Sequence, residues 1–349
     1  MGKKRKTLPK NFEELLASGD MQALKKIFDN CELDAYGGYA KRSAIGFDQC
    51  PDELVVWLVE QGADLHKEDQ YGDSPLHQRA SSRRSSIKVL LDLGADVTKS
   101  TKRIGTPLHV AAIYHNVPNA KLLLQYGSDI SAKDSAGMTP LERALAYCAN
   151  IDIIDMVEIA KLFFEHGADE TPRMKDFVTK IGETFEFHRD GFNKDSVDEV
   201  SDALSELYKL FKVTPVKKRL LHDGKSEILI KDGQCQNQYE ELWNTLIPSN
   251  GPAQTVQGEV IRIAGRISDE VLRNGGSNWD NEYRKMGKAY ILHISSGESL
   301  SGSEISEAKS VLSSFKNLEE GADQLAKFAV KWVSQNTQPI ALTKPDYNR

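Results

Sequence analysis

The sequence predicts an all-α protein: an α-solenoid of short helical repeats with β-turn tips, followed by a mainly α-helical C-terminal domain that can include a small β-hairpin. Three observations lead to this prediction. Two phrases recur in step, at intervals of about 32 residues. Each copy of the second phrase contains a glycine near its end. Beyond residue 172 the repetition stops, and apolar residues continue at helical spacing.

The first phrase begins a helix in each repeat. It reads Ser74-Pro75-Leu76-His77, then Thr106-Pro107-Leu108-His109, and finally Thr139-Pro140-Leu141-Glu142. Serine and threonine are good N-cap residues, and proline fits the first helical position, where its missing N–H would be unpaired anyway. The phrase therefore predicts a helix start near residues 75, 107 and 140.

The second phrase ends the next helix. It occupies residues 58–64, 90–96, 123–129 and 163–169, and its glycines are Gly62, Gly94, Gly127 and Gly167. Glycine adopts the left-handed conformation of a helix end without a Cβ clash. Residues 69–72 and 134–137 then have the composition of turns that lead to the next unit. One repeat is therefore turn, helix, helix and glycine.

These two phrases resemble the ankyrin repeat. The resemblance covers residues 11–171 as about five units, of which the first two are degenerate and the last is lengthened over 148–155. It implies that His77 and His109 bind backbone groups and pack the stack, rather than act in catalysis. One departure is Arg79, which stands where such repeats usually carry a small buried alanine. The whole chain, including 185–189 and 251–280, also resembles uncharacterised bacterial ankyrin-repeat proteins.

Such stacks usually bind other proteins, because the turn tips and the exposed side of the first helices are free to vary. The resemblance places the family's usual contact positions on Tyr39, Gln70, Tyr71, Asp73, Ser82, Lys102, Arg103, Tyr114, Met138 and Tyr147. The four tyrosines are the leading candidates, since tyrosine offers a large, stiff contact surface with a polar tip. The alternative is that these side chains cover neighbouring repeats.

Composition predicts a cytoplasmic protein. Hydrophobic residues make up 40% of the 349 residues, and the longest apolar run is too short to span a bilayer. Cys31, Cys50, Cys148 and Cys235 share no metal-ligand spacing, which is typical of reduced cysteines. We therefore expect no metal, no cofactor and no membrane partner. The basic residues 3–6 could form a nucleic-acid or nuclear-import patch, but a frayed terminus is the commoner cause of so short a run.

Charge indicates the kind of partner. Residues 11–172 hold 16 Lys and Arg against 25 Asp and Glu, a difference of −9. An acidic solenoid favours a basic protein partner and makes nucleic acid an unlikely one, because like-charged partners are repelled. The sequence leaves the oligomeric state open.

Five segments follow from these patterns. We expect a basic N-terminal tail over 1–10, the repeats over 11–171, and a helical cap over 172–215, where Met174, Val178 and Ile181 mark one apolar face. A helical domain should occupy 216–338, with a strand and turn near 227–233 and a helix break at Gly321. Residues 339–349 would be a second tail.

The segment 251–280 carries the candidate ligand site of the C-terminal domain. The site would be built from Gln257, Glu259, Arg262, Arg266, Asn274, Asn278, Trp279 and Asp280. On a helix, Gly258 and Gly265 would form a stripe of small residues where another helix packs closely. The alternative is a structural helix whose charges pair with one another. No catalytic motif accompanies the segment, so no catalytic residue is predicted.

These observations predict a non-enzymatic ankyrin-type scaffold that binds a basic protein. The resemblance to bacterial ankyrin-repeat proteins implies a toxin-neutralising, immunity-type role as one form of that function. The alternative is that the C-terminal helical domain is an enzyme or binds a small ligand, while the repeats act as a targeting module.

Overall fold

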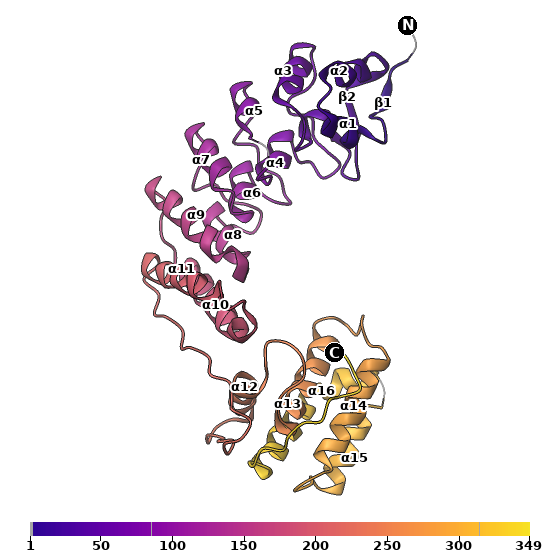
Figure 1. Ribbon diagram of the computed structural model, residues 1–349, viewed down its shortest axis with the longest axis vertical. Coiled ribbons are helices and arrows are strands. Elements are labelled where there is room, and N and C mark those ends of the chain that lie inside the picture. The colour runs from indigo at the N-terminus through magenta and orange to yellow at the C-terminus, as the bar shows by residue number, and fades with distance from the viewer. Residues whose placement is uncertain (1–2, 85, 314) are drawn as a thin grey trace. The chain divides into compact units, whose positions relative to one another are not determined.

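The computed structural model describes residues 3–84, 86–313 and 315–349, and it divides into two compact units (Figure 1). Unit 1 comprises the chain up to Glu183 together with Asp195–Val216. Unit 2 comprises Thr184–Lys194 and Lys217–Arg349. Residues 184–194, which the sequence analysis assigned to the cap, therefore belong to unit 2.

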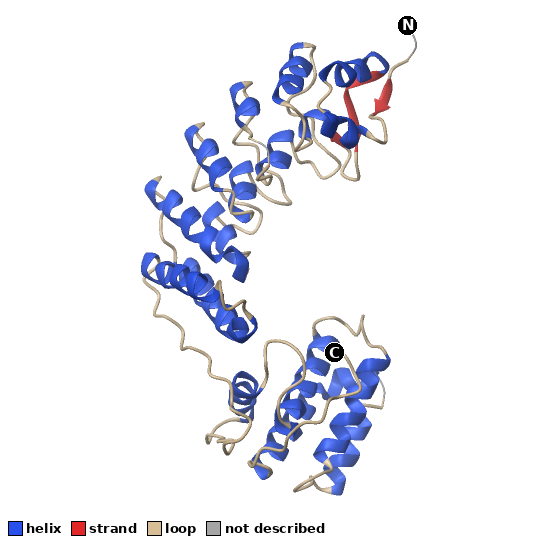
Figure 2. Cartoon of the chain, in the orientation of Figure 1, coloured by secondary structure: helices blue, strands red, loops and turns tan. Residues whose placement is uncertain are grey.

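Unit 1 begins with two helices and a small sheet, which holds the strands of this region (Figure 2). The helices are α1 (Phe12–Ser18) and α2 (Met21–Asn30). Strand β2 (Cys31–Gly37) is central, with β1 (Arg5–Thr7) parallel to it and β3 (Arg42–Ser43) antiparallel. Part of the segment expected as a basic tail is thus strand β1, followed by a buried Leu8. The strand differs from the predicted tail because β1 is held by backbone pairing with β2, which the side chains of a short basic run do not reveal.

Paired helices follow in sequence order and form two layers (Figure 1). The first helices of three repeats form one layer: α4 (Pro75–Ala80), α6 (Pro107–Ile113) and α8 (Pro140–Ala146). The second helices form the other: α3 (Asp52–Glu60), α5 (Lys88–Asp92), α7 (Val117–Gln125) and α9 (Ile153–Glu165). The short 3-10 helices η1 (Ala44–Gly46) and η2 (Asn150–Asp152) precede α3 and α9.

The repeated phrases act as predicted. Pro75, Pro107 and Pro140 open α4, α6 and α8. The phrase glycines take positive φ after the second helices, for example 89° at Gly94 and 84° at Gly127. A Cβ atom at these two glycines would meet nothing within 4 Å, so the backbone conformation alone favours glycine there.

The phrase histidines tie one repeat to the next. His77 Nδ1 lies 2.8 Å from Ser74 Oγ, and its Nε2 lies 3.1 Å from the Gly105 carbonyl oxygen. His109 is held by Thr106 in the same way and reaches the carbonyl of Met138. Both rings are buried in the stack. The structural interpretation of these histidines is therefore confirmed.

Two longer helices follow the repeats, and residues 184–188 at the end of the first belong to unit 2. Helix α10 (Pro172–His188) and helix α11 (Val197–Leu210) follow α9, and α11 packs against it. The apolar faces expected from the sequence are buried, including Met174 and Val178 on α10 and Leu204 and Leu207 on α11. The short 3-10 helix η3 (Arg189–Gly191) follows α10 in unit 2.

Unit 2 is a bundle of α12 (Cys235–Leu246), α13 (Val256–Leu272), α14 (Asn281–Ile294), α15 (Gly302–Val311) and α16 (Phe315–Gln335). Helix α13 contacts α12, α14 and α16. Its buried Val260, Ile263 and Ile267 share one core with residues such as Tyr290 and Trp332. The core therefore centres on the segment that the sequence singled out.

Unit 2 differs from expectation in three places. Residues 227–230 are irregular rather than a strand, although Ile228 is buried and its N–H donates to the Thr337 carbonyl. Gly321 lies inside α16 rather than at a helix break. A Cβ there would approach Val311 Cγ2 to 2.7 Å, so this glycine allows α15 and α16 to pack closely. Residues 339–349 run back along the bundle, where Val256 donates to the Ile340 carbonyl at 2.8 Å.

Candidate functional site

Four tyrosines are exposed on the turn tips and first helices of unit 1. Tyr39 lies in the turn between β2 and β3 and Tyr71 in the turn before α4, while Tyr114 and Tyr147 follow α6 and α8. Their exposed fractions are 88, 45, 53 and 59% in that order. A large part of each side chain is therefore open to solvent. We call these four residues the tyrosine surface.

Neighbouring turns hold the first part of this surface together. The side-chain amide of Gln70 donates to the Tyr39 carbonyl at 2.8 Å, and the Gln70 N–H donates to the Ala40 carbonyl at 3.0 Å. The neighbouring Tyr71 side chain raises the pKa of Tyr39 through a hydrogen bond. Asp69 Oδ1 accepts from the N–H groups of Tyr71 and Asp73, which fixes the shape of the second turn. Tyr39, Gln70 and Tyr71 therefore form one cluster.

Arg103 links this cluster to the next repeat. Its guanidinium lies over the Tyr71 ring, 5.7 Å from the centroid, and forms an ion pair with Asp73. Asp73 is buried, so it positions Arg103 and is not itself available to a partner. Lys102 is exposed beside it. Of the three candidates here, Lys102 and Arg103 can contact another protein directly.

A similar arrangement surrounds Tyr147. Arg143 lies over the Tyr147 ring at 5.4 Å and pairs with the buried Asp134 at 2.5 Å. Arg143 was not among the residues predicted from the sequence. Its i,i+4 spacing from Tyr147 nevertheless indicates that the two side chains can meet on a helix. The 3-10 helix η2 adds Ile151, whose side chain is 84% exposed. Only the structure shows that this apolar side chain is uncovered.

The remaining two candidates have structural roles. The Ser82 carbonyl accepts the side-chain amides of Asn116 and Asn119 at 2.8 and 3.1 Å. The Met138 carbonyl receives the His109 bond, and its N–H donates to Asp134 Oδ1 at 3.0 Å. Both residues are half-buried. Their backbones serve the stack, and their side chains are partly exposed.

Comparison with known proteins decides the family of these repeats. Residues 43–134 match the family model of ankyrin repeats (3 copies). The protein contains ankyrin repeats. The ankyrin repeats imply a scaffold for protein–protein interaction.

Several named ankyrin proteins are similar to this chain. A putative ankyrin repeat protein of Rickettsia bellii is 32% identical over 108 residues, which cover 30% of this chain and 59% of the relative. A putative ankyrin repeat protein of Fowlpox virus is 31% identical over 106 residues, 29% of this chain and 31% of the relative. The mouse ankyrin repeat and SOCS box protein 5 is 34% identical over 105 residues, 30% of each chain. The match thus spans about a third of the viral and mouse relatives.

Most of the candidate ligand residues in unit 2, outside the ankyrin repeats, are engaged by the fold. Gln257 Nε2 donates to the carbonyls of Asn336 and Gln338 at 2.8 and 2.7 Å, and its Oε1 accepts the Ile340 N–H at 3.0 Å. Gln257 is fully buried. It therefore fixes the C-terminal segment to α13, and no group of its amide is left for a ligand.

Glu259 and Arg262 form a buried ion pair. Arg262 donates to both carboxylate oxygens, at 2.6 and 2.9 Å, and Glu259 also accepts from the Ala253 N–H and from the Tyr347 hydroxyl. Burial by itself would raise the pKa of Glu259, but Arg262 and the other donors outweigh it, so the pKa is lowered. The carboxylate is thus charged and fully paired.

The loop after α13 is organised by Glu270. Its carboxylate accepts from Asn274 Nδ2 at 3.2 Å and from the Asn278 N–H and Nδ2 at 2.6 and 3.1 Å. Asp280 caps α14 by accepting from the N–H groups of Glu282 and Tyr283, and Trp279 stacks on Tyr283 at 5.3 Å. These four candidates act in the fold, as the structural-helix interpretation expects.

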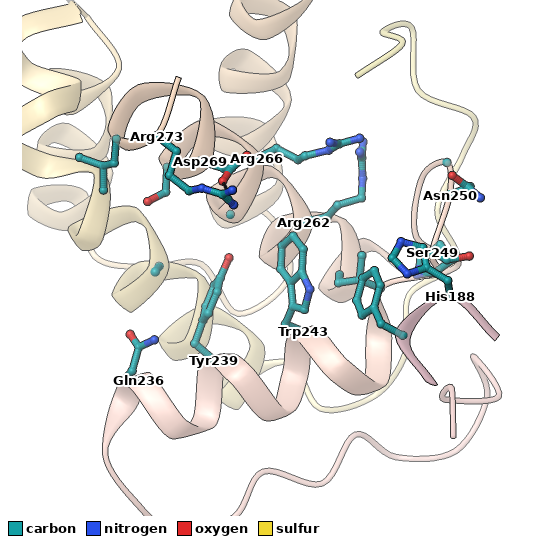
Figure 3. A pocket seen from close by; sticks show the side chains of 18 of the residues that line it. His188, Gln236, Tyr239, Trp243, Ser249, Asn250, Arg262, Arg266, Asp269 and Arg273 are labelled. Carbon is teal, nitrogen blue, oxygen red and sulfur yellow. Dashed lines mark hydrogen bonds and ion pairs between the residues drawn. The ribbon is translucent and has the colours of Figure 1, made fainter. Parts of the chain in front are cut away.

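Arg266 is different. It is exposed, and it makes no hydrogen bond or ion pair with any residue that the structure describes. Together with Arg262, Asn274 and Asn278 it lines a polar hollow beside Tyr347. It also lines a second pocket, between α12 and α13 (Figure 3). Of the eight candidates, Arg266 is the one that remains available to an anionic ligand.

In the described ranges 3–84, 86–313 and 315–349, no helix is both long enough and apolar enough to cross a membrane. Within the same ranges, no three His, Cys, Asp or Glu side chains gather as a metal site would require.

Proposed function

We propose that the ankyrin repeats bind a protein partner through the tyrosine surface. The observation that carries this proposal is the exposure of Tyr39, Tyr71, Tyr114 and Tyr147 on the tips and first helices. Large aromatic side chains left open to water favour association, and tyrosine is enriched among residues that dominate binding energies. The exposed Ile151, four residues after Tyr147 in the sequence, adds apolar area.

We propose that the partner is basic. Residues 11–172 carry a difference of −9 between basic and acidic residues, by the count above. The arginines near the tyrosine surface do not reverse the negative charge of the repeats. Each of them, Arg83, Arg103 and Arg143, forms an ion pair with an aspartate. A partner with positive charge would be attracted over distances of about 8–10 Å at moderate salt, and an acidic one would be repelled.

A toxin-neutralising role in a bacterial cytoplasm is the specific form of this function that we propose. Its supports are the acidic surface, the similarity to a Rickettsia ankyrin protein, and four cysteines that form no disulfide. A basic secreted toxin would have the charge required. Occupying its surface with the tyrosines would block it without any chemistry.

The test is recovery of the partner from the native cell extract with the tagged full chain. Replacing Tyr71 and Tyr114 together by alanine should abolish recovery, because each hot-spot tyrosine typically contributes about 2 kcal/mol. The melting temperature should be nearly unchanged, since both side chains are exposed. Tyr126→Ala is the matched control: Tyr126 follows α7 in the second layer and bonds Asp92. Equal recovery by the double variant and the control would refute the proposal.

The alternative function, small-ligand binding by the helical unit 2, is favoured by one observation. A pocket in this unit combines aromatic walls with the unpaired Arg266.

A further inference from the structure

The pocket has a volume of about 620 Å³ and lies entirely within unit 2. Figure 3 shows Tyr239 and Trp243 projecting from α12 toward Arg262 and Arg266, with His188, Ser249 and Asn250 at one end. Ligand pockets in proteins have volumes of roughly 300–1,000 Å³ and combine apolar walls with a few polar groups. The size and lining therefore suit one small molecule.

Its aromatic wall is held rigidly. Tyr239 donates its hydroxyl to the Ile261 carbonyl at 2.9 Å, and the Tyr239 and Trp243 ring centroids lie 6.2 Å apart. Gly265 allows this arrangement, because a Cβ there would come within 2.3 Å of Trp243 Cζ3. Trp243 Nε1 has no hydrogen-bond partner among the described residues. The wall thus offers flat ring surfaces and one unused donor.

The charged side of the pocket has one arginine to spare. Arg262 is paired with Glu259, and Arg273 is paired with Asp269 at 2.8 Å. Arg266, on the same helix, has no such acid. A guanidinium presents a planar fork of N–H donors that matches the oxygens of a phosphate or carboxylate. Arg266 is therefore the anion-binding group of this lining.

A hydrogen-bond acceptor lies at the end of the pocket. His188 Nδ1 is 2.8 Å from the Thr184 carbonyl oxygen, so Nδ1 must carry the proton. In the tautomer with its proton on Nδ1, the ring presents Nε2 as an acceptor. The exposed Asn250 beside it supplies an amide that can both donate and accept. These groups suit the N–H and carbonyl edges of a heterocycle.

We propose that this pocket binds a free nucleoside monophosphate. The base would stack on Trp243 and Tyr239, an exocyclic amino group would donate to His188 Nε2, and the phosphate would bind Arg266. A flat heterocycle that carries an anion satisfies the aromatic wall, the acceptor and the unpaired guanidinium together. The inference concerns unit 2 and does not depend on the protein-binding function of the ankyrin repeats.

Calorimetric titration of the full-length protein tests the proposal. The probes are AMP, GMP, CMP and UMP, with adenosine, guanosine and inorganic phosphate as partial ligands. At least one monophosphate should bind saturably, and Arg266→Ala should weaken it about tenfold or more while affecting the nucleoside little. Arg284→Ala is the matched control, because Arg284 is exposed and unpaired among the described residues but lies outside this pocket.

Three results would overturn the proposal: no saturable binding of any monophosphate at millimolar concentration, equal affinity of the wild type and the Arg266→Ala variant, or clearly tighter binding of a short single-stranded oligonucleotide. Trp243→Leu gives a second test, since it should weaken nucleosides and nucleotides alike. Its circular dichroism must match the wild type. The Tyr71 and Tyr114 double variant should bind the nucleotide normally, which separates this proposal from the protein-binding one.

Discussion

His109 Nε2 lies 3.0 Å from the Met138 carbonyl oxygen, so the side chain that opens one helix is bonded to the turn before the next. Its Nδ1 accepts the Thr106 N–H at 3.1 Å, which leaves the proton on Nε2. In the following repeat Glu142 stands in this place, accepting the Thr139 N–H at 2.9 Å and the Thr171 hydroxyl at 2.8 Å. Histidine suits a carbonyl neighbour and glutamate a hydroxyl neighbour.

The stack should lose stability in mild acid through its histidines. Burial lowers the pKa of His109 below its ordinary value of 6.5, and the unfolded chain takes up the proton more readily. The contribution of His109 to the free energy of unfolding is therefore fully present above about pH 6.5 and is lost as the pH drops below that value. Urea unfolding midpoints measured between pH 8 and pH 5 would show this decline.

His109→Gln isolates the effect, because glutamine can accept from Thr106 and donate to Met138 without titrating. At pH 8 its stability should lie within about 1 kcal/mol of the wild type. At pH 5 the wild type should have lost more stability than the variant. Identical pH dependence of the two proteins would contradict the assignment of a neutral His109.

Breaking the buried ion pair of α13 should be costly. Glu259→Gln leaves the Arg262 charge buried without an acid, and such losses typically cost about 3–5 kcal/mol. Arg273→Ala, at the C-cap of the same helix, is the control. Its pair with Asp269 is exposed (81 and 45%), so the cost should be below about 1 kcal/mol. Denaturant unfolding measures the stability of both variants. Similar losses would show that the buried ion pair contributes no more to stability than the exposed one.

Arg79 should behave in the opposite way. It is buried, but its Nε and Nη1 have no hydrogen-bond partner among the described residues, and Asp52 is 3.6 Å from Nη2. Arg79→Met should therefore leave the free energy of unfolding unchanged or raise it by about 1–4 kcal/mol. Arg79→Ala should lower it by about 2–5 kcal/mol through the cavity it leaves. If Arg79→Met is less stable than Arg79→Ala, the Nε and Nη1 groups of Arg79 form stabilising interactions, and the prediction is wrong.

The contact between α12 and α13 should tolerate no side chain at Gly265. Gly265→Ala would force Trp243 and Tyr239 away from α13 and lower stability by about 1–3 kcal/mol. Gly302→Ala, at the start of α15, meets nothing within 4 Å and should be neutral or stabilising by up to about 1 kcal/mol. Melting temperatures of the two variants compare them directly. An unchanged value for Gly265→Ala would argue against close packing there.

The local elements of unit 1 could be predicted from the sequence because their causes are local. Ser74 and Pro75 begin α4 and Gly94 follows the end of α5 through neighbouring backbone geometry, and the same letters recur at a fixed period. The stripe of Gly258 and Gly265 likewise indicated a close helix contact before α12 was placed against it.

The tertiary structure decided which polar side chains are used. Hydrogen bonds between segments that are distant in the sequence leave no periodic pattern. The bond from the Tyr347 hydroxyl to Glu259 and the pairing of β1 with β2 could therefore not be predicted. The same holds for the candidate site. In the sequence, Arg262 and Arg266 lie four residues apart on one expected helix and are equally good candidates for binding a ligand. Glu259, three residues before Arg262 on the same helix, pairs with it, whereas the acids that follow Arg266 are used elsewhere: Asp269 pairs with Arg273, and Glu270 binds Asn274 and Asn278. Only the tertiary structure shows this, because the bonds of Glu270 depend on how the loop after α13 folds back on the helix.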